Sequence, residues 1–298
     1  FVAGMDYHIW QRLAVFGYLA AVALSVAVML FGREINGSKR WLALGPFSFQ
    51  PSEFAKVALI LFLADLVTKN VKTIGKMWTL CRIMFWILPI VGLVGASNLS
   101  TAIIILGIGV ILIFVASPKY AQFALMGLAG ACFMGIFLAL ESYRLERLAI
   151  WRNPEKYEKG YQTLQGLYAI GSGGVFGVGL GNSVQKLGFV PEAQNDMIFS
   201  IICEELGLAG AGIIVFLFLL LIWRFFMIAS GSRDLFGALI ATGAMAHMMI
   251  QVVLNIAVVT NTIPNTGITL PFISYGGTSV MFLLIEMGLV LSVSQVVD

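Results

Sequence analysis

The sequence is poor in charged residues. Only 11% of its 298 residues are charged and 59% are hydrophobic, with a mean hydropathy of +0.95. Soluble domains carry about 25% charged residues, so a chain of this size folded in water would have too little charge to cover its surface. The composition therefore excludes an ordinary soluble enzyme and indicates that lipid surrounds most of the protein.

Cysteine is also scarce. Cys81, Cys132 and Cys203 are scattered through apolar stretches, without the paired spacing of disulfide frameworks or zinc sites. The formal net charge of +3 is small and spread along the chain. These shortages argue against a disulfide framework, a structural metal centre and a nucleic-acid partner.

Long apolar runs are abundant. A transmembrane helix needs about 20 mostly apolar residues, and seven runs qualify as spans: 13–31, 82–96, 101–116, 123–140, 198–228, 235–259 and 278–293. An eighth run, 54–67, contains Lys56 and Asp65, so we expect it to span only if both charges face protein or water. The predicted fold class is an all-α polytopic membrane protein with a bundle of about eight transmembrane helices. Because the chain begins at Phe1 inside an apolar segment, we expect further helices upstream.

Basic residues predict the orientation, since cytoplasmic loops carry an excess of Lys and Arg. The set assigned to the cytoplasm comprises Arg12, Lys69, Lys72, Lys76, Arg82, Lys119, Arg224 and Arg233. The segments 32–52, 141–197 and 260–277 are then outside. We expect a single membrane domain over 1–298, with 141–197 as its long extracytoplasmic loop and with re-entrant segments.

The first outer segment leads into a charged helix start. Pro51 suits the first helical turn, and Glu53 then lies near the positive end of the helix dipole. Glu53 and Lys56 are three residues apart and can form an ion pair. The pair either lets a helix with a buried lysine insert at tolerable cost or forms the polar wall of a cavity, and we favour the cavity.

The long outer segment contains a glycine-rich run, 171–182, which does not match the dinucleotide-binding spacing. We expect it to form irregular backbone packed against protein. Lys186, which follows the run, is either a phosphate ligand or a solvated surface lysine. Asp196 lies at the entrance to the next helix and either caps it or begins a polar stripe with Ser200 and Glu204. Glu204 and Glu205 are costly within a span unless they are paired or face water, which predicts that this face borders a cavity.

Two further patterns are polar. His247, Gln251 and Asn255 recur every four residues on one span, which predicts hydrogen bonds between helices rather than chemistry. The third outer segment, 264–279, contains two prolines and three glycines among apolar residues, which predicts a re-entrant turn. Its backbone amides either bind an anionic group or belong to an inert plug.

Four segments together resemble the SEDS proteins (shape, elongation, division and sporulation). They are 36–41 (NGSKRW), 50–56 (QPSEFAK), 191–199 (PEAQNDMIF) with 204–207 (EELG), and 270–277 (LPFISYGG). They occur in the family's order across essentially the whole chain. The segments 181–186 (GNSVQK) and 266–272 (TGITLPF) resemble the division and sporulation branch, FtsW and SpoVE, more than the elongation branch, RodA. Asn195 and Met197 depart from the family pattern around Asp196.

The resemblance implies a ten-helix bacterial membrane glycosyltransferase, whose first helices are absent from this sequence. It implies that the enzyme polymerises lipid II into glycan strands on the outer face of the plasma membrane, with a class B penicillin-binding protein as its partner. It also implies that Asp196 is the essential outer-loop aspartate, and that Trp41, Glu53 and Lys56 lie in cavity motifs.

Lipid II polymerisation needs a base near the acceptor hydroxyl and positive charge near the lipid pyrophosphate. We predict that Asp196 is the base. The predicted substrate-binding residues are Trp41, Glu53, Lys56, Lys39, Arg40, Lys186, Gln194, Ser274, Tyr275 and Gly276. A divalent cation at the pyrophosphate is compatible with the sequence, which shows no evident metal cluster. The alternatives are a lipid II flippase, which needs the same polar cavity, and a non-catalytic division scaffold.

Overall fold

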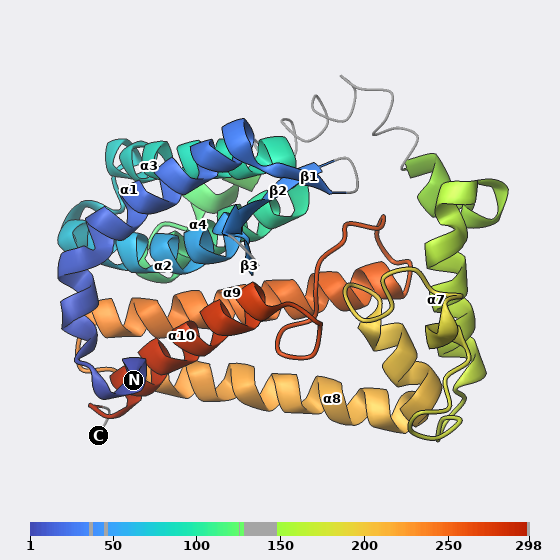
Figure 1. The fold of residues 1–298 in the computed structure, drawn as a ribbon. Helices are drawn as coiled ribbons and strands as arrows, with labels where there is room; N and C mark the ends of the chain where they lie inside the picture. The colour runs from blue at the N-terminus through green and yellow to red at the C-terminus, as the bar shows by residue number, and fades with distance from the viewer. Residues whose placement is uncertain (36–37, 45–46, 125, 128–147, 297–298) are drawn as a thin grey trace. The chain divides into compact units, whose positions relative to one another are not determined.

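The computed structural model describes residues 1–35, 38–44, 47–124, 126–127 and 148–296 (Figure 1). The chain folds into two compact units. Unit 1 comprises Phe1–Tyr120, Ile222–Ile250 and Gly276–Asp298, and unit 2 comprises Ala121–Leu221 and Gln251–Tyr275. The expectation of a single domain stays a prediction, and each unit is described by itself.

Unit 1 is built from helices whose starts are encoded locally. Its helices are α1 (Tyr7–Phe31), α2 (Pro51–Asn70), α3 (Met77–Ser97), α4 (Leu99–Ala116), α10 (Gly277–Ser294), the end of α8 (Ile198–Gly231) and the first part of α9 (Leu235–Val259). Asp6 caps α1 by accepting a hydrogen bond from the His8 amide, and Asn98 caps α4 through the Thr101 amide. Pro51 occupies the first turn of α2, as predicted.

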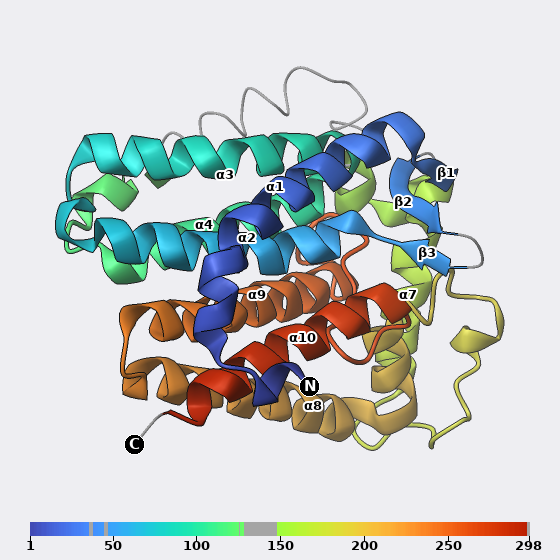
Figure 2. The ribbon, with the colours of Figure 1, turned by 60° about the vertical axis from the view of Figure 1, so that its left-hand side comes forward.

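Helix α2 forms the core of unit 1. It packs against α1, α3, α4 and α10, and Figure 2 shows it alongside α1. Fourteen of its twenty residues are buried, including Lys56 and Asp65. Both charged side chains therefore face protein. The sequence analysis expected this segment to span the membrane only if they face protein or water.

Six described helices are long and apolar enough to cross a membrane. They are α1, α3, α4, α8, α9 and α10, and they confirm six of the seven clear spans predicted. The remaining span, 123–140, lies mostly outside the described residues. The fold class is confirmed as a helical membrane protein.

The segment 32–52 contains strands that the sequence analysis did not predict. Strand β1 (Arg33–Ile35) pairs antiparallel with β2 (Ser38–Leu44), which pairs antiparallel with β3 (Phe47–Phe49). A small sheet therefore connects α1 to α2 where we expected a loop, and it adds to the all-α class. The alternation of apolar and polar residues at Phe47, Ser48 and Phe49 is a sequence signal for a strand that the sequence analysis did not use.

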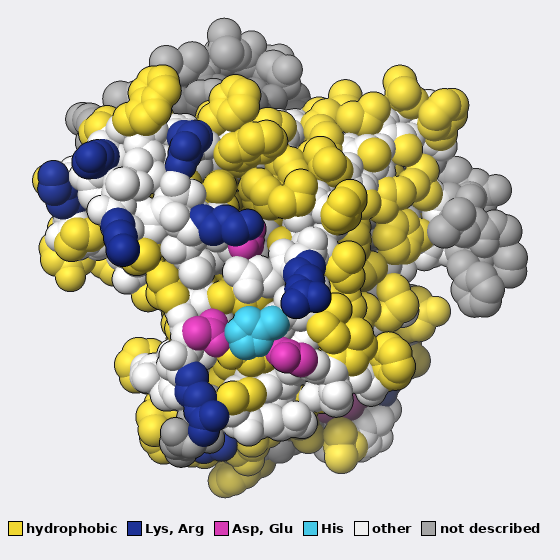
Figure 3. All heavy atoms as spheres, turned by 90° about the vertical axis from the view of Figure 1, so that its left-hand side faces the viewer, with side chains coloured by type: hydrophobic (Ala, Val, Ile, Leu, Met, Phe, Trp, Pro, Cys, Tyr) yellow, Lys and Arg dark blue, Asp and Glu magenta, His cyan; other side chains and the backbone are white. Residues whose placement is uncertain are grey.

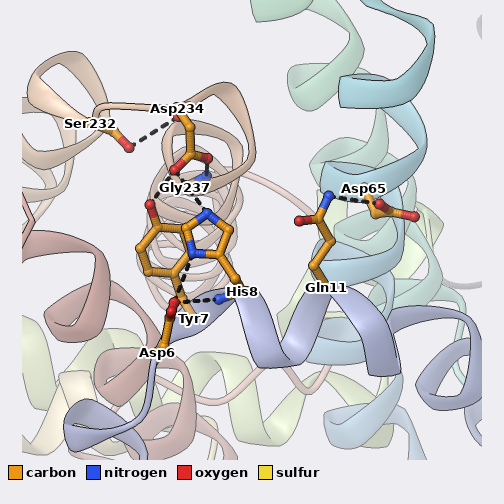
Figure 4. A network of polar contacts seen from close by, with 8 residues as sticks. All are labelled: Asp6, Tyr7, His8, Gln11, Asp65, Ser232, Asp234 and Gly237. Carbon is orange, nitrogen blue, oxygen red and sulfur yellow. Dashed lines mark hydrogen bonds and ion pairs between the residues drawn. The ribbon is translucent and has the colours of Figure 1, made fainter.

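One face of unit 1 carries the basic residues that we assigned to the cytoplasm. They lie in or beside α1, α2, α3, α4, α8 and α9, and Figure 3 shows Lys and Arg side chains gathered on this face. Figure 4 shows the polar network at its centre. The Tyr7 hydroxyl donates to Asp234, His8 Nε2 lies 3.4 Å from the same carboxylate, and Gln11 donates to Asp65 at 3.0 Å. The network ties the start of α1 to the start of α9 and to α2.

Unit 2 contains α7 (Tyr161–Ser172), the first part of α8, the end of α9 and the segment up to Tyr275. Three short 3-10 helices, Pro154–Lys156, Glu158–Gly160 and Gln185–Leu187, accompany α7 within the predicted long loop. The loop is therefore partly helical in its described part.

Helix α8 is broken at Gly207, and the glycine-rich run packs into the break. Gly207 has φ 68° and ψ −170°, a conformation that is essentially restricted to glycine. The amides of Val178 and Gly179 donate to the carbonyls of Glu204 and Glu205, each at 3.0 Å. Those carbonyls are satisfied by the run rather than by the helix. The glycines thus serve close backbone packing, as the sequence predicts.

We expect Gly207→Ala to disrupt unit 2. A β-carbon at Gly207 would lie 2.4 Å from the Gly177 nitrogen and the Val175 oxygen, and the positive φ adds backbone strain. The substitution should destabilise the protein by about 3 kcal/mol or more. The measurement is thermal unfolding in detergent.

Gly212→Ala in the same helix is the matched control, because a β-carbon there meets no atom within 4 Å. The control should unfold at the temperature of the parent protein or above it. An equal melting temperature for Gly207→Ala and Gly212→Ala would contradict the close packing at the break.

Candidate functional site

Asp196 lies in unit 2, in the turn that precedes α8. Its side chain is almost fully buried, with 8% of the residue exposed. Gln162 of α7 donates to the Asp196 carboxylate at 3.3 Å, and the Asp196 and Met197 amides also donate to it. The carboxylate therefore accepts hydrogen bonds from the backbone of its own turn and from α7.

Burial raises the pKa of Asp196 to about 6, and the nearby Glu192 carboxylate adds to the rise. The hydrogen bonds from Gln162 and from the two backbone amides act in the opposite direction but are outweighed. Asn265 holds Gln162 in place, since its amide donates to the Gln162 side-chain oxygen at 3.0 Å. The site thus presents a carboxylate that is ionised at neutral pH and basic enough to accept a proton.

Asn255 of α9 fixes the backbone around Asp196. Its amide nitrogen donates to the Asp196 carbonyl at 2.9 Å and to the Ile268 carbonyl at 2.7 Å. Gln251, one turn earlier, donates to the Thr269 carbonyl at 3.0 Å. These residues make hydrogen bonds, as the four-residue repeat predicts, but their acceptors are loop carbonyls rather than groups on another helix.

The segment up to Tyr275 closes over the turn that holds Asp196. The Ser274 hydroxyl donates to the Asn195 carbonyl at 2.6 Å and accepts from the Leu270 amide at 2.7 Å. The Tyr275 amide donates to the Gln194 carbonyl at 2.8 Å. Three predicted site residues, Gln194, Ser274 and Tyr275, are therefore brought beside Asp196.

Gly267 lies beside the Asp196 carboxylate. It has φ 67°, and a β-carbon there would lie 3.8 Å from Asp196 Oδ2. A glycine at this position keeps that side of the carboxylate open. The sequence analysis singled out neither Gly267 nor Gln162, and their spacing from Asp196 along the chain offered no signal.

Lys186, Glu204 and Glu205 form a separate cluster in unit 2. Lys186 Nζ lies 2.6 Å from Glu205, and the Ser183 hydroxyl and the Val184 amide donate to Glu204. Both glutamates thus hold the end of the glycine-rich run. The glutamates of the polar stripe predicted along this helix bind protein groups, and Lys186 is an exposed lysine that forms an ion pair with Glu205.

Glu53 and Lys56 lie in the core of unit 1. Lys56 Nζ is 3.0 Å from Glu53, and the two residues are 2% and 6% exposed. The Ser279 hydroxyl of α10 donates to Glu53. His247 Nδ1 lies 2.8 Å from Glu286 in the same unit. The sequence analysis missed Glu286, although an acid within the apolar run 278–293 is itself a signal.

The remaining predicted residues are placed as follows. Arg40 Nε donates to the Ser97 carbonyl at 3.1 Å, and Trp41 is half-buried in β2. Gly276 immediately precedes α10. The backbone of Lys39 pairs with Glu34 in the sheet, and its side chain lies outside the described residues.

Among the described residues, no group of three or more His, Cys, Asp or Glu side chains is arranged to hold a metal ion. The divalent cation considered from the sequence stays a prediction.

Comparison with known proteins identifies the family. A family model for the FtsW, RodA and SpoVE proteins, described as "Cell cycle protein", matches residues 1–298. The chain belongs to this family. The SEDS resemblance carried by the four motifs is thus confirmed along the whole chain.

Curated relatives favour the division and sporulation branch. Stage V sporulation protein E of Bacillus subtilis is 40% identical over 99% of this chain and 82% of its own length. The probable peptidoglycan glycosyltransferase FtsW of Trichlorobacter lovleyi is 35% identical over 97% of this chain and 78% of its own length. This SEDS protein is therefore similar to both FtsW and SpoVE, as the sequence analysis predicts.

Solved structures share its fold. A chain from a structure described as "Structural coordination of polymerization and crosslinking by a peptidoglycan synthase complex" aligns with a TM-score of 0.86 and 30% identity, over 98% of this chain and 84% of that chain. The rod shape determining protein RodA of Thermus thermophilus aligns with a TM-score of 0.71 and 29% identity, over 99% and 81%. The membrane fold of the family is thus the fold of this chain.

We expect Asp196→Asn to stabilise the SEDS protein at neutral pH. A carboxyl whose pKa rises from 3.8 to about 6 on folding destabilises the folded state when it is ionised. The cost is at most about 3 kcal/mol above pH 6 and disappears as the pH falls towards 4. Asn removes this cost, so its melting temperature at pH 7.5 should exceed that of the parent.

The difference in melting temperature should narrow as the pH falls from 7.5 to 4.5. Glu155→Gln, which changes an exposed carboxyl in the same unit, is the control and should leave the melting temperature unchanged. A lower melting temperature for Asp196→Asn at pH 7.5 would show that the ionised carboxylate stabilises the fold instead.

Proposed function

We propose that this SEDS protein is a peptidoglycan glycosyltransferase that polymerises lipid II at the outer face of the bacterial plasma membrane. Family membership and the FtsW relatives named as probable peptidoglycan glycosyltransferases support the activity. The observation that carries the mechanism is Asp196, a buried carboxylate held among hydrogen-bond donors with its pKa raised to about 6.

The reaction joins an acceptor sugar hydroxyl to the anomeric carbon of a donor sugar. The hydroxyl oxygen forms the new bond to that carbon while the bond to the lipid pyrophosphate breaks, so the pyrophosphate leaves with the electron pair and the anomeric configuration inverts. The hydroxyl proton must go to a base. Because the leaving group is already good, a second carboxylate acting as nucleophile is not needed.

Asp196 has the properties of this base. A general base works best when its pKa is near the operating pH. With a pKa of about 6, Asp196 is ionised at neutral pH, yet it accepts a proton more readily than an ordinary aspartate with a pKa of 3.8. Gln162 and the loop contacts hold the carboxylate in one place, which limits the reorganisation needed when the acceptor arrives.

The cations proposed for the pyrophosphate are those that the sequence analysis named. Lys56, with Glu53 as its partner, is the first candidate, and Arg40 and Lys39 are the next. Lys186 is a further candidate, and Glu205 pairs with its ammonium at 2.6 Å. We keep Trp41, Tyr275 and Gly276 as substrate contacts, and Tyr275 is 75% exposed.

Gln194 and Ser274 are reassigned within this proposal. The Gln194 carbonyl and the Ser274 hydroxyl are engaged with the loops that carry Asp196. We therefore assign them to positioning Asp196 rather than to binding substrate.

Helix topology supports the proposed orientation. Asp196 precedes the first residue of α8, whereas Arg233 follows its last residue. The two ends of a spanning helix lie on opposite sides of the membrane, and the basic end faces the cytoplasm. Asp196 is then on the outer side. We also propose a class B penicillin-binding protein as partner, since a similar chain belongs to a synthase complex that coordinates polymerisation with crosslinking.

The test is polymerisation of lipid II by the full-length protein with its cognate transpeptidase in detergent, with glycan products resolved on a gel. Asp196→Asn should lower kcat by about 10²–10⁴, the usual contribution of a general base. Glu192→Gln is the matched control: it removes a neighbouring carboxylate from the same turn and should keep most of the activity.

Each outcome separates one reading from another. Polymer from the parent and from Glu192→Gln alone supports both the activity and the base. Equal rates for the parent and Asp196→Asn would discard Asp196 as the base. If no protein makes polymer while the parent moves lipid II across vesicle membranes, the protein is a flippase.

A further inference from the structure

Among its described residues, unit 1 buries two glutamates and one lysine. Glu53 and Lys56 of α2 are 6% and 2% exposed, and Glu286 of α10 is 1% exposed. A carboxylate in such an environment must be paired or hydrogen-bonded, because an isolated buried charge is very costly. Both glutamates are potential partners for the single ammonium. The observed pairing joins Lys56 to Glu53 at 3.0 Å.

His247 of α9 is the hydrogen-bond partner of Glu286. Its Nδ1 lies 2.8 Å from Glu286 Oε2, and the histidine is 2% exposed. The other oxygen, Oε1, is buried without a hydrogen-bond partner in the described part of the chain. Glu286 is therefore held on one side only, and it retains the capacity to accept an ammonium.

Helix packing brings the two pairs together. Helices α2 and α9 run antiparallel in Figure 2, and a β-carbon at Gly243 would lie only 2.5 Å from Ile60 Cγ2. Lys56 is one turn before Ile60, and His247 is one turn after Gly243, so in antiparallel helices both lie on the same side of this close approach.

One face of helix α10 carries both Ser279 and Glu286. Ser279 donates to Glu53, and Glu286 follows Ser279 by seven residues, about two helical turns. The face that meets Glu53 therefore continues to Glu286, which meets His247. The lysine thus lies in a helix interface that offers it one carboxylate at each end.

We propose that His247 is a positioning residue for Lys56. By holding Glu286, His247 prevents the second carboxylate from drawing the Lys56 ammonium away from Glu53. This inference rests on the proposed function, in which the Glu53–Lys56 pair serves the lipid pyrophosphate substrate. Loss of His247 removes the partner of the buried Glu286 carboxyl group, and Lys56 can then pair with it.

The test is a double-mutant cycle with apolar replacements of similar size. The parent, His247→Leu, Glu286→Leu and the double variant are compared for kcat/KM in lipid II polymerisation. His247→Leu should lower kcat/KM about tenfold or more, which corresponds to a coupling of about 1.4 kcal/mol. Glu286→Leu should stay within about threefold of the parent, because no second carboxylate then competes for Lys56.

The decisive result is the double variant, which should recover to within about threefold of the parent because removing Glu286 abolishes the competition. A structural role alone would leave the double variant no better than His247→Leu, and that result would overturn the proposal. Thr242→Val is the control on the same helix: this residue is 4% exposed, and its hydroxyl donates to the Ala238 carbonyl within α9. It should leave kcat/KM unchanged.

A structural measurement separates this inference from the proposed function. In a crystal structure of His247→Leu, Lys56 Nζ should leave Glu53 and lie within hydrogen-bond distance of Glu286. Lys56 remaining about 3 Å from Glu53 would overturn the inference, whatever the activity. Absence of polymer from the parent protein would overturn the proposed function and leave this structural test intact.

Discussion

Asn255 is the residue on which the geometry around Asp196 depends. This fully buried amide donates to the Asp196 carbonyl at 2.9 Å and to the Ile268 carbonyl at 2.7 Å. It thereby joins the turn before α8 to the segment that follows α9. Both segments lack regular secondary structure there, so their backbone groups need partners from side chains. Ser274 and Gln162 add further hydrogen bonds around the same turn, and together they hold a carboxylate that would otherwise move with a loop.

Lipid surroundings explain why so many polar groups in this protein are paired. Water is absent from the bilayer core, so ionisable side chains there must find protein partners. Glu53 has Lys56, Glu286 has His247, and Asp65 has Lys69 and Gln11. The same requirement applies to the backbone at Gly207, where the glycine-rich run supplies the hydrogen bonds that α8 lacks. Asp196 lies outside the spanning segments, and burial raises its pKa to about 6.

The sequence predicted those features that depend on local patterns. Apolar run length located six helices that are long and apolar enough to span a membrane. The run 54–67 was expected to span only if Lys56 and Asp65 face protein or water, and both residues are buried in protein. Motif resemblance located Asp196 at the entrance to α8. The contacts of Gln162 with Asp196 and of Lys186 with Glu205 join residues far apart in the chain, so no local pattern reveals them. The sheet was missed because its strands are short, and Glu286 was missed because it interrupts an apolar run only once.

The central claim is that Asp196 acts as a base whose pKa is raised by burial. Its most direct test is the pH dependence of kcat/KM for lipid II polymerisation between pH 4.5 and 8. Because the base must be ionised, the rate should fall as the pH drops below an apparent pKa near 6. In Glu192→Gln the fall in rate should occur at a lower pH, since the Glu192 carboxylate raises the pKa of Asp196. A rate that stays constant down to pH 4.5, or a fall at the same pH in Glu192→Gln and the parent, would contradict the account.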